Sequence, residues 1–191
     1  ITSNGTAHVI TLQTYQLNKD QRLFTNVGCA SMGYGLPAAI GACMGNNKQP
    51  VICIEGDGSI MMNLQELETI KGYNLPVKII IINNEGYLSI KLSQESFFKG
   101  KEFASGPKNG VTIPSFKKVA KSFDLPYMSI NNNDEIEDIL ENMMNTKGPC
   151  VVEVFTHPKE RHEPKVTHKG VGKDGKIIPG TLTDMYISDT F

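Results

Sequence analysis

The sequence predicts a doubly wound α/β fold, in which a parallel sheet carries helices on both faces. Short apolar runs bounded by turn residues alternate with amphipathic segments, which is the pattern of βα units. The central runs are rich in Val and Ile along their whole length, as strands buried on both faces are. The 191 residues, 39% hydrophobic, suffice for one such domain with a full core. We therefore predict one domain over residues 1–156, followed by a tail over residues 157–191.

The apolar runs and amphipathic segments give a strand and helix order. The strand candidates are residues 22–25, 51–55, 77–83, 126–130 and 150–155. The helix candidates are residues 7–17, 36–44, 63–72, 86–94, 114–123 and 134–145. Pro37 and Pro114 suit a first helical turn, and Asn133-Asp134 offers a capping side chain. We expect a loop at 99–110 and, in the polar tail, a turn at 173–176. The chain opens at Ile1 without Met, so we expect a piece of a longer polypeptide.

Charge and composition exclude several classes of partner. The chain has 19 basic and 20 acidic residues and no polybasic run, so neither nucleic acid nor an anionic membrane is an expected partner. Its longest apolar stretch, around 79–82, is far too short to span a bilayer. The four cysteines form no CxxC pair, and Cys53 and Cys150 lie inside apolar runs, where Cys serves as a small hydrophobe. We therefore expect a soluble protein in the reducing cytoplasm.

Two polar clusters end neighbouring strands of the predicted sheet. Gly56-Asp57-Gly58 follows one buried run and Asn83-Asn84 ends the next, with residues 59–82, 24 positions, between them. This spacer holds one helix and one strand, so both clusters emerge at the carboxyl edge of the sheet, where α/β proteins bind ligands. The Asp and Asn oxygens suit Mg2+, and the N–H groups of Gly58 and Ser59 at a helix start suit phosphate. The site thus predicts a metal-bridged diphosphate.

Either cluster alone is a common turn or strand end, but together they resemble the signature of thiamine diphosphate enzymes. The surrounding sequence is similar to the C-terminal pyrophosphate-binding domain of acetolactate synthase-like proteins, over roughly residues 1–160. The segments that carry this resemblance are MGYGLPAAIGA at 32–42, LQEL at 64–67 and YNLPVK at 73–78. The resemblance implies the thiamine diphosphate-binding fold.

The resemblance implies particular ligands for the metal and the diphosphate. Asp57, Asn84 and the carbonyl of Gly86 would bind Mg2+, and Gly58 and Ser59 would hold the diphosphate. Further residues of the implied cofactor site are Gly5, Thr6, Ala7, Gly56 and Tyr87. The family has a Gly-Gln-His turn where this sequence has Gly-Thr-Ala, so the expected contacts there come from the backbone.

The resemblance also implies how the cofactor would be held in its bent shape. Met32 falls where the family places an apolar wedge, and the carbonyl of Ala30 would accept a hydrogen bond from the 4′-amino group. An ordinary core methionine is the alternative for Met32. Gly33, Gly35 and Gly41 lack the spacing of a dinucleotide fingerprint, and we expect them to permit close packing.

In the family, the activating glutamate comes from a pyrimidine-binding domain, usually of another subunit, which this chain lacks. We assign no catalytic residue within this chain, since Glu55 lies in a predicted strand and Glu66 on the helix behind the diphosphate. The isolated chain is therefore expected to be inactive. Its expected partners are that domain, a 2-keto acid substrate and further copies of the chain in a homodimer or homotetramer.

The leading hypothesis is the cofactor domain of a 2-keto acid decarboxylase or carboligase. Acetolactate synthases carry a Trp where this sequence has Ser93, so a 2-hydroxyacyl or sulfonate-substrate lyase stays open. A non-catalytic diphosphate or nucleotide module and a purely structural domain stay open as well. The tail also looks like that of acetolactate synthase-like proteins, on the basis of its segments 161–165 and 182–185. Its His157, His162 and His168 either line a closed active site or are solvated.

Overall fold

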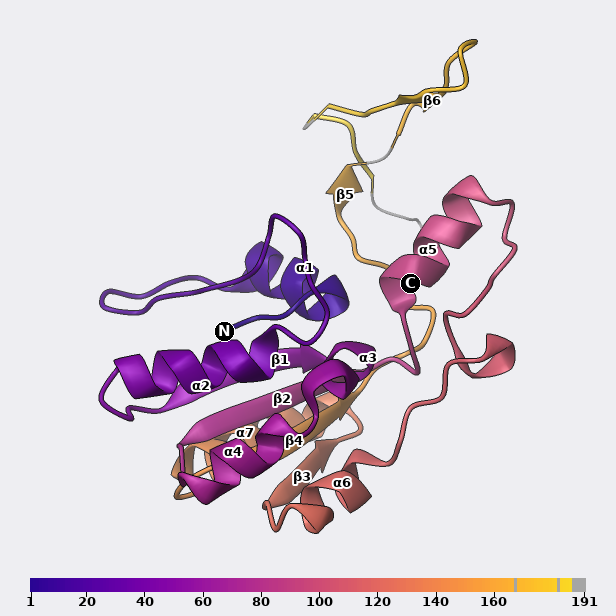
Figure 1. Ribbon diagram of the computed structural model, residues 1–191. Helices are drawn as coiled ribbons and strands as arrows, with labels where there is room; N and C mark the ends of the chain where they lie inside the picture. The colour runs from indigo at the N-terminus through magenta and orange to yellow at the C-terminus, as the bar shows by residue number, and fades with distance from the viewer. Residues whose placement is uncertain (167, 182, 187–191) are drawn as a thin grey trace. The chain divides into compact units, whose positions relative to one another are not determined.

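A computed structural model describes residues 1–166, 168–181 and 183–186 and divides the chain into two compact units, Ile1–Glu160 and Arg161–Phe191 (Figure 1). The first unit is built on a four-stranded sheet in the order β1-β2-β4-β3, and every neighbouring pair of strands is parallel. The strands are β1 (Val51–Gly56), β2 (Val77–Asn83), β3 (Tyr127–Ile130) and β4 (Cys150–Phe155). They agree with four of the five predicted strands. The boundary predicted at 156/157 stays a prediction.

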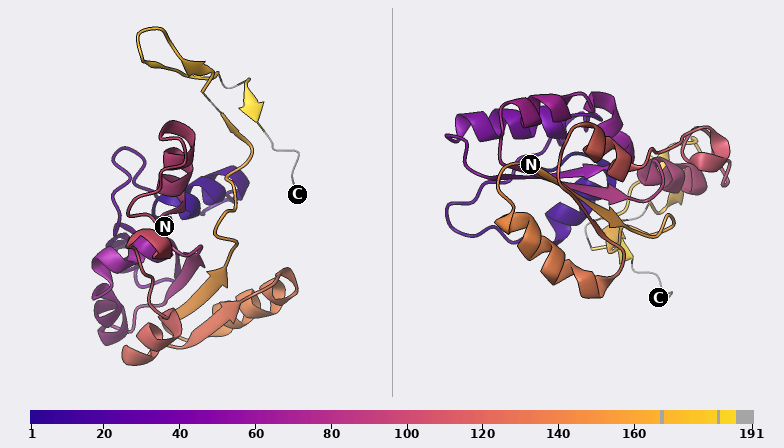
Figure 2. Two further views of the ribbon diagram at one scale, coloured as in Figure 1. Left: turned by 90° about the vertical axis from the view of Figure 1, so that its right-hand side faces the viewer. Right: turned by 90° about the horizontal axis from the view of Figure 1, so that it is seen from below.

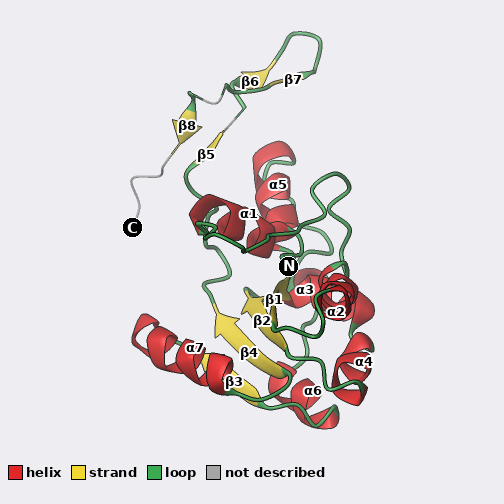
Figure 3. Cartoon of the chain, turned by 90° about the vertical axis from the view of Figure 1, so that its left-hand side faces the viewer, coloured by secondary structure: helices red, strands yellow, loops and turns green. Residues whose placement is uncertain are grey.

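Helices cover both faces of the sheet, which confirms the predicted doubly wound architecture. On one face lie α2 (Gly35–Gly45), α4 (Glu66–Gly72) and α6 (Phe116–Ser122), and on the other lies α7 (Ile136–Asn145) (Figure 3). The view from below in Figure 2 shows the sheet between the purple α2 and the orange α7.

The residues of β2 alternate between the two faces, as a strand's period of two requires. Ile79 and Ile81 belong to the larger apolar cluster, which also contains Leu36 of α2, Leu67 of α4 and Phe116 of α6. Ile80 packs against the smaller cluster, which contains Met143 of α7 and Val152 of β4. Both faces of β2 are therefore covered, which explains why its sequence is apolar without alternation.

The strand predicted at residues 22–25 is wrong. Only Thr25 makes a bridge, to Thr2, and Thr2 also bridges Ile54 of β1. The chain start occupies the edge of β1, since the N–H of Ser3 donates to the carbonyl of Ile54 at 2.9 Å. Because residues 1–3 take up the hydrogen-bonding edge of the sheet, the segment 22–25 can reach it only through Thr2.

Several helix boundaries differ from the prediction because local hydrogen bonds set them. The helix predicted over 7–17 is α1 (Gly5–Thr14), and the one predicted over 86–94 is α5 (Leu88–Phe97). Pro114 lies outside α6, whose N-cap is Ser115, with a side chain that accepts from Lys118 N–H. The predicted cap at 133–134 is instead Asn132, which accepts from Asp134 N–H ahead of η3 (Asn133–Glu135) and α7.

The helix predicted over 63–72 begins earlier and is divided. The chain passes from α3 (Asp57–Ile60) through η1 (Met61–Asn63) into α4. The backbone stays in the right-handed helical region through Leu64 and Gln65, so the division reflects tighter hydrogen bonds and no break. This segment starts at Asp57, directly after β1. The predicted loop 99–110 is a loop with one short turn, η2 (Pro107–Asn109).

The second unit is a polar segment with two short antiparallel strand pairs. β5 (Lys165–Val166) pairs with β8 (Met185–Tyr186), and β6 (Gly170–Val171) pairs with β7 (Ile177–Ile178). The predicted turn at 173–176 joins β6 to β7 and is closed by Gly172 N–H donating to the Lys176 carbonyl at 2.8 Å. Leu182, which falls in the tail resemblance, lies outside the described residues. None of the described helices is long and apolar enough to cross a membrane.

Candidate functional site

The two polar clusters meet at the carboxyl edge of the sheet, as the strand order predicted. β1 ends at Gly56 beside Ile82 of β2, so Asp57 and Asn84 follow adjacent strands at the same edge (Figure 1). The Asp57 Oδ2 accepts the N–H of Asn84 at 3.1 Å and the N–H of Gly86 at 2.9 Å. The Asp57 carboxylate therefore holds the turn after β2 against the start of α3.

Asp57 is almost fully buried, at 1% exposure. Burial raises the pKa of its carboxyl to about 6, and the N–H groups of Gly86, Gly58, Asn84 and Glu85 oppose the rise in that order. Burial is unfavourable for a carboxylate without a cationic partner. A cation bound at this carboxylate would remove much of that penalty.

The side-chain amide of Asn84 uses only one of its two polar atoms in a hydrogen bond. Its Nδ2 donates to Thr6 Oγ1 at 3.1 Å, which ties the start of α1 to the end of β2. Its Oδ1 is buried and has no hydrogen-bond partner. Buried polar atoms are rarely left unpaired, so an unpaired amide oxygen on a residue bonded to a buried carboxylate fits a hard cation such as Mg2+.

Close packing fixes the backbone around this pair. Gly86 has a φ of 131°, and a Cβ there would lie 2.6 Å from the Ser105 carbonyl oxygen. Its own carbonyl, the third predicted metal ligand, accepts from Leu88 N–H at 3.2 Å and keeps a second lone pair. At Gly58, a Cβ would overlap Cε1 of Tyr87, so the Tyr87 ring lies directly against the start of α3.

The groups predicted to hold the diphosphate already make bonds within the chain. The N–H of Gly58 donates to Asp57 Oδ1 at 2.7 Å. The buried Ser59 hydroxyl bonds to Ser3 Oγ at 2.7 Å and accepts the N–H of Gly33 at 3.0 Å. The Ser59 hydroxyl thus joins α3 to the chain start and to the loop before α2, and its role toward a diphosphate stays a prediction.

The other predicted cofactor residues lie on segments tied to this edge. Gly5, with a φ of 60°, begins α1, and Ala7 is buried in the first turn. The Ala30 carbonyl accepts from Asn4 Nδ2 at 2.8 Å, which leaves a second lone pair for a ligand. Met32 is half-buried and belongs to neither apolar cluster, and its role as a wedge stays a prediction.

A model of a known protein family matches most of this chain. The family described as "Thiamine pyrophosphate enzyme, C-terminal TPP binding domain" matches residues 3–154. This chain belongs to that family.

Curated relatives of this thiamine pyrophosphate enzyme domain are acetolactate synthases. Acetolactate synthase 2, chloroplastic, of Nicotiana tabacum is 35% identical over 166 residues, which is 85% of this chain and 25% of the relative. The acetolactate synthase isozyme 1 large subunit of Escherichia coli (strain K12) is 35% identical over 165 residues, 86% of this chain and 29% of the relative. Acetolactate synthase 1, chloroplastic, of Zea mays is 32% identical over 178 residues, which is 91% of this chain and 28% of the relative. The chain thus spans about a quarter of the length of the relatives that it matches.

Some residues that build the site of this thiamine pyrophosphate enzyme domain were not predicted. Ser3 and Asn4 hold Ser59 and the Ala30 carbonyl, and Glu153 holds the side chain of Asn83. One feature of the sequence distinguishes Glu153, which is the charged residue inside the otherwise apolar run 150–155. Glu55 does lie inside a strand, as predicted, and Glu66 begins α4.

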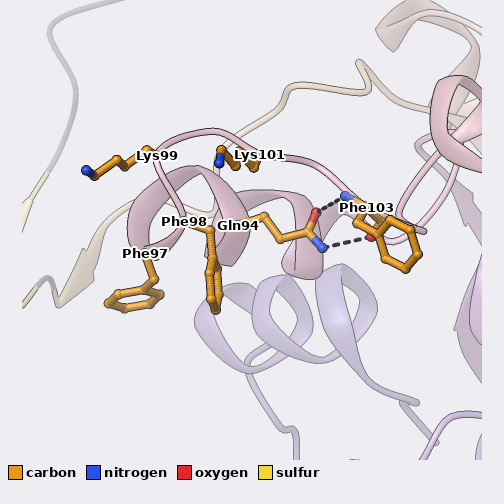
Figure 4. A pocket seen from close by; sticks show the side chains of 6 residues that line it. All are labelled: Gln94, Phe97, Phe98, Lys99, Lys101 and Phe103. Carbon is orange, nitrogen blue, oxygen red and sulfur yellow. Dashed lines mark hydrogen bonds between the residues drawn. The ribbon is translucent and has the colours of Figure 1, made fainter.

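An open pocket of about 560 Å³ lies apart from the predicted cofactor residues (Figure 4). At its lining, Gln94 bonds to the backbone of Phe103, with Nε2 donating to the Phe103 carbonyl at 2.8 Å and Oε1 accepting the Phe103 N–H at 3.1 Å. The pocket is lined by Gln94, Phe97, Phe98, Lys99, Lys101 and Phe103. None of these is a predicted site residue.

The three histidines of the predicted tail fall in different units. His157 is exposed in the first unit, where its Nδ1 accepts from Lys159 N–H at 3.2 Å. His162 and His168 belong to the second unit. A role for them in closing an active site stays a prediction.

Proposed function

We propose that this chain binds the diphosphate of thiamine diphosphate through Mg2+, as the cofactor domain of a 2-keto acid decarboxylase or carboligase. The observation that carries the proposal is the buried, unpartnered Oδ1 of Asn84, on a residue whose N–H donates to the buried carboxylate of Asp57. Together with the carbonyl of Gly86, these atoms make the mixed oxygen set that Mg2+ accepts beside phosphate oxygens and water.

In this proposal, each segment at the sheet edge has one task. Asp57, Asn84 and Gly86 hold Mg2+, while the segment of Gly58 and Ser59 and the turn at Gly5 face the diphosphate. Met32 and the Ala30 carbonyl orient the remainder of the cofactor. When bound, thiamine diphosphate supplies a carbanion that adds to a carbonyl and an electron sink for the carboxylate that leaves. The chain itself binds and orients, and no side chain in it is assigned to proton transfer.

The proposed partners follow from the length of the relatives. Because the chain spans about a quarter of them, we propose that a pyrimidine-binding domain with the activating glutamate lies elsewhere in the protein or in another subunit. A homodimer or homotetramer would bring the two domains together. Four free cysteines support a reducing compartment, and we keep the cytoplasm as the proposed one, although the plant relatives are named chloroplastic.

The test removes the carboxylate ligand. In the full-length protein, Asp57→Ala should abolish Mg2+-dependent binding of thiamine diphosphate, because the diphosphate charge would then face too few cationic partners. Isothermal titration calorimetry with thiamine diphosphate, with and without Mg2+, measures this. Asp134→Ala, which removes an exposed carboxylate in η3, ahead of α7, is the matched control and should leave the affinity unchanged.

Two results would overturn the proposal. One is unchanged affinity of the Asp57→Ala variant, which would remove Asp57 from the metal site. The other is tighter binding of ATP or NAD than of thiamine diphosphate, which would favour a nucleotide-binding module without this chemistry.

A further inference from the structure

Another buried carboxyl group, that of Glu153, contacts the turn that carries the proposed metal ligands. Glu153 is on β4, opposite Ile81 of β2 and Ser129 of β3, and is only 3% exposed. Its neighbours Val151, Val152 and Val154 are apolar, so the strand accommodates one charged group in a core environment. Such a group is stable only when hydrogen bonds replace its lost water.

Both oxygens of Glu153 accept short hydrogen bonds from side chains of the two flanking strands. Oε1 accepts from Asn83 Nδ2 at 2.6 Å, and Oε2 accepts from the Tyr127 hydroxyl at 2.6 Å. Burial, reinforced by the Glu153 carboxylate, raises the pKa of Tyr127, so its hydroxyl stays a donor. The carboxylate therefore joins β3 to the last residue of β2.

This contact fixes which way the Asn83 amide points. Because a carboxylate only accepts, the NH2 group of Asn83 must face Glu153, and its Oδ1 must face the other way. That Oδ1 accepts the N–H of Glu85 at 3.1 Å. Glu85 has a φ of 61°, a conformation that is unfavourable for a residue with a side chain and needs local support.

The turn held in this way is the one that presents the proposed ligands. It contains Asn84, whose Oδ1 is unpartnered, and Gly86, whose N–H reaches the Asp57 carboxylate. The Asn83 carbonyl also accepts the N–H of Thr156 at 2.9 Å, so the residue directly after β4 supports the turn through its backbone.

We propose that Glu153 is a positioning residue that sets the Mg2+ affinity of this domain by fixing the Asn83 amide, with Tyr127 holding Glu153 in place. The inference rests on the proposed function, since it assigns a task toward the Mg2+ that Asp57 and Asn84 would bind. Hydrogen-bond partners behind metal ligands commonly change metal affinity by about 10- to 100-fold when they are removed.

A buried charge at the opposite end of β2 provides a matched control. Lys78 is 2% exposed, and its Nζ donates to the carbonyls of Thr146 and Gly148, away from the carboxyl edge. Glu153→Met and Lys78→Met each replace a buried charge by the same apolar side chain in neighbouring strands. Both should destabilise the fold, but only the first should affect the metal site.

The experiment measures thiamine diphosphate binding to the full-length protein by calorimetry over a series of Mg2+ concentrations. Glu153→Met should raise the Mg2+ concentration for half-saturation by roughly 10- to 100-fold, and Lys78→Met should leave it unchanged. Tyr127→Phe, a milder change that keeps the Asn83 contact, should raise it by roughly threefold. It serves as the decisive variant if Glu153→Met does not fold.

A swapped pair tests the hydrogen-bond polarity itself. In Asn83→Asp with Glu153→Gln, the new carboxylate at 83 can accept from Glu85 N–H and from the new amide at 153, whose oxygen can accept from Tyr127. The total charge is unchanged, and the Mg2+ half-saturation should return to within about threefold of the original, since each net hydrogen bond is worth roughly 1 kcal/mol.

The outcomes separate this inference from the proposed function. If the unmodified protein shows no Mg2+-dependent binding of thiamine diphosphate, the proposed function itself is wrong. If that binding is present but Glu153→Met and Tyr127→Phe lower only the melting temperature, Glu153 is a structural residue and this inference fails. A swapped pair that binds Mg2+ no better than Glu153→Met would also contradict it.

Discussion

At the residue scale, two buried carboxyl groups of opposite environment lie close together in the sequence. Asp57 accepts three backbone hydrogen bonds, whereas both oxygens of Glu55 are buried without a hydrogen-bond partner. Burial raises the pKa of Glu55 to about 7. The hydroxyls of Ser3 and Ser59 and the N–H groups of Gly35 and Leu36 oppose the rise, although none reaches hydrogen-bond geometry. The folded chain therefore favours the protonated form of Glu55.

The burial of Glu55 predicts that the free energy of unfolding depends on pH, and Glu55→Gln should reduce this dependence. The folded-state pKa of about 7 lies above the ordinary value of 4.5, so the folded chain binds this proton more tightly than the unfolded chain. Its contribution to the free energy of unfolding is complete below pH 4.5 and is lost as the pH rises through 7, a change of roughly 3 kcal/mol at most. Gln cannot titrate, so the variant should lose less stability over this range.

Chemical unfolding at several pH values between 4 and 8 measures the effect. Glu68→Gln, at an exposed position on α4, is the control and should follow the unmodified chain. If the Glu55→Gln variant and the unmodified chain show parallel curves, the Glu55 proton is not taken up on folding.

At the scale of elements, the central strands could be predicted from the sequence, whereas most helix starts could not. β2 and β4 are apolar runs buried on both faces, so composition alone fixes them within a residue. The start of α5 depends on Gly86 and on the Tyr87 N–H, which donates to the distant Ser105 carbonyl. The meeting of Asp57 and Asn84 at one edge could be predicted, because strand order sets the edge of a parallel sheet at which both residues lie. Glu153 could not, because it meets Asn83 across 70 residues.

Gly35 and Gly41, two of the three glycines of α2, make a matched pair for testing how this helix packs against Glu55. A Cβ at Gly35 would overlap Glu55 Oε1, whereas a Cβ at Gly41 would meet no atom within 4 Å. Gly41→Ala should therefore stabilise the helix by about 0.5–1 kcal/mol. Gly35→Ala should destabilise the fold by about 1–3 kcal/mol, because the Glu55 carboxyl must move in a full core.

Denaturant unfolding of the two variants gives both free energies. The cost of Gly35→Ala should also shrink when it is made together with Glu55→Ala, which removes the obstructing group. An equal cost in both backgrounds would show that the two side chains do not interact.

At the scale of the whole molecule, the chain is short beside the relatives that it matches. It spans 25% of the Nicotiana tabacum relative and 29% of the Escherichia coli relative. Within the first unit, α1 and its C-cap residue expose large apolar side chains, with Ile10, Leu12 and Tyr15 between 40% and 47% exposed. The segment with the proposed diphosphate turn thus presents apolar surface of the kind that further parts of a protein cover.

The isolated 191-residue chain should therefore be inactive on pyruvate, even with saturating thiamine diphosphate and Mg2+. Its proposed residues hold the metal and the diphosphate, but none is placed to activate the cofactor, and positioning of the reacting groups accounts for much of an enzyme's rate. Carbon dioxide release from labelled pyruvate measures this, with the full-length protein as the positive control and cofactor alone as the background. Adding a separately expressed remainder of the protein should restore activity if the two parts reassemble. Steady turnover by the chain alone, above the cofactor background and lost in the Asp57→Ala variant, would mean that a complete active site lies within these residues.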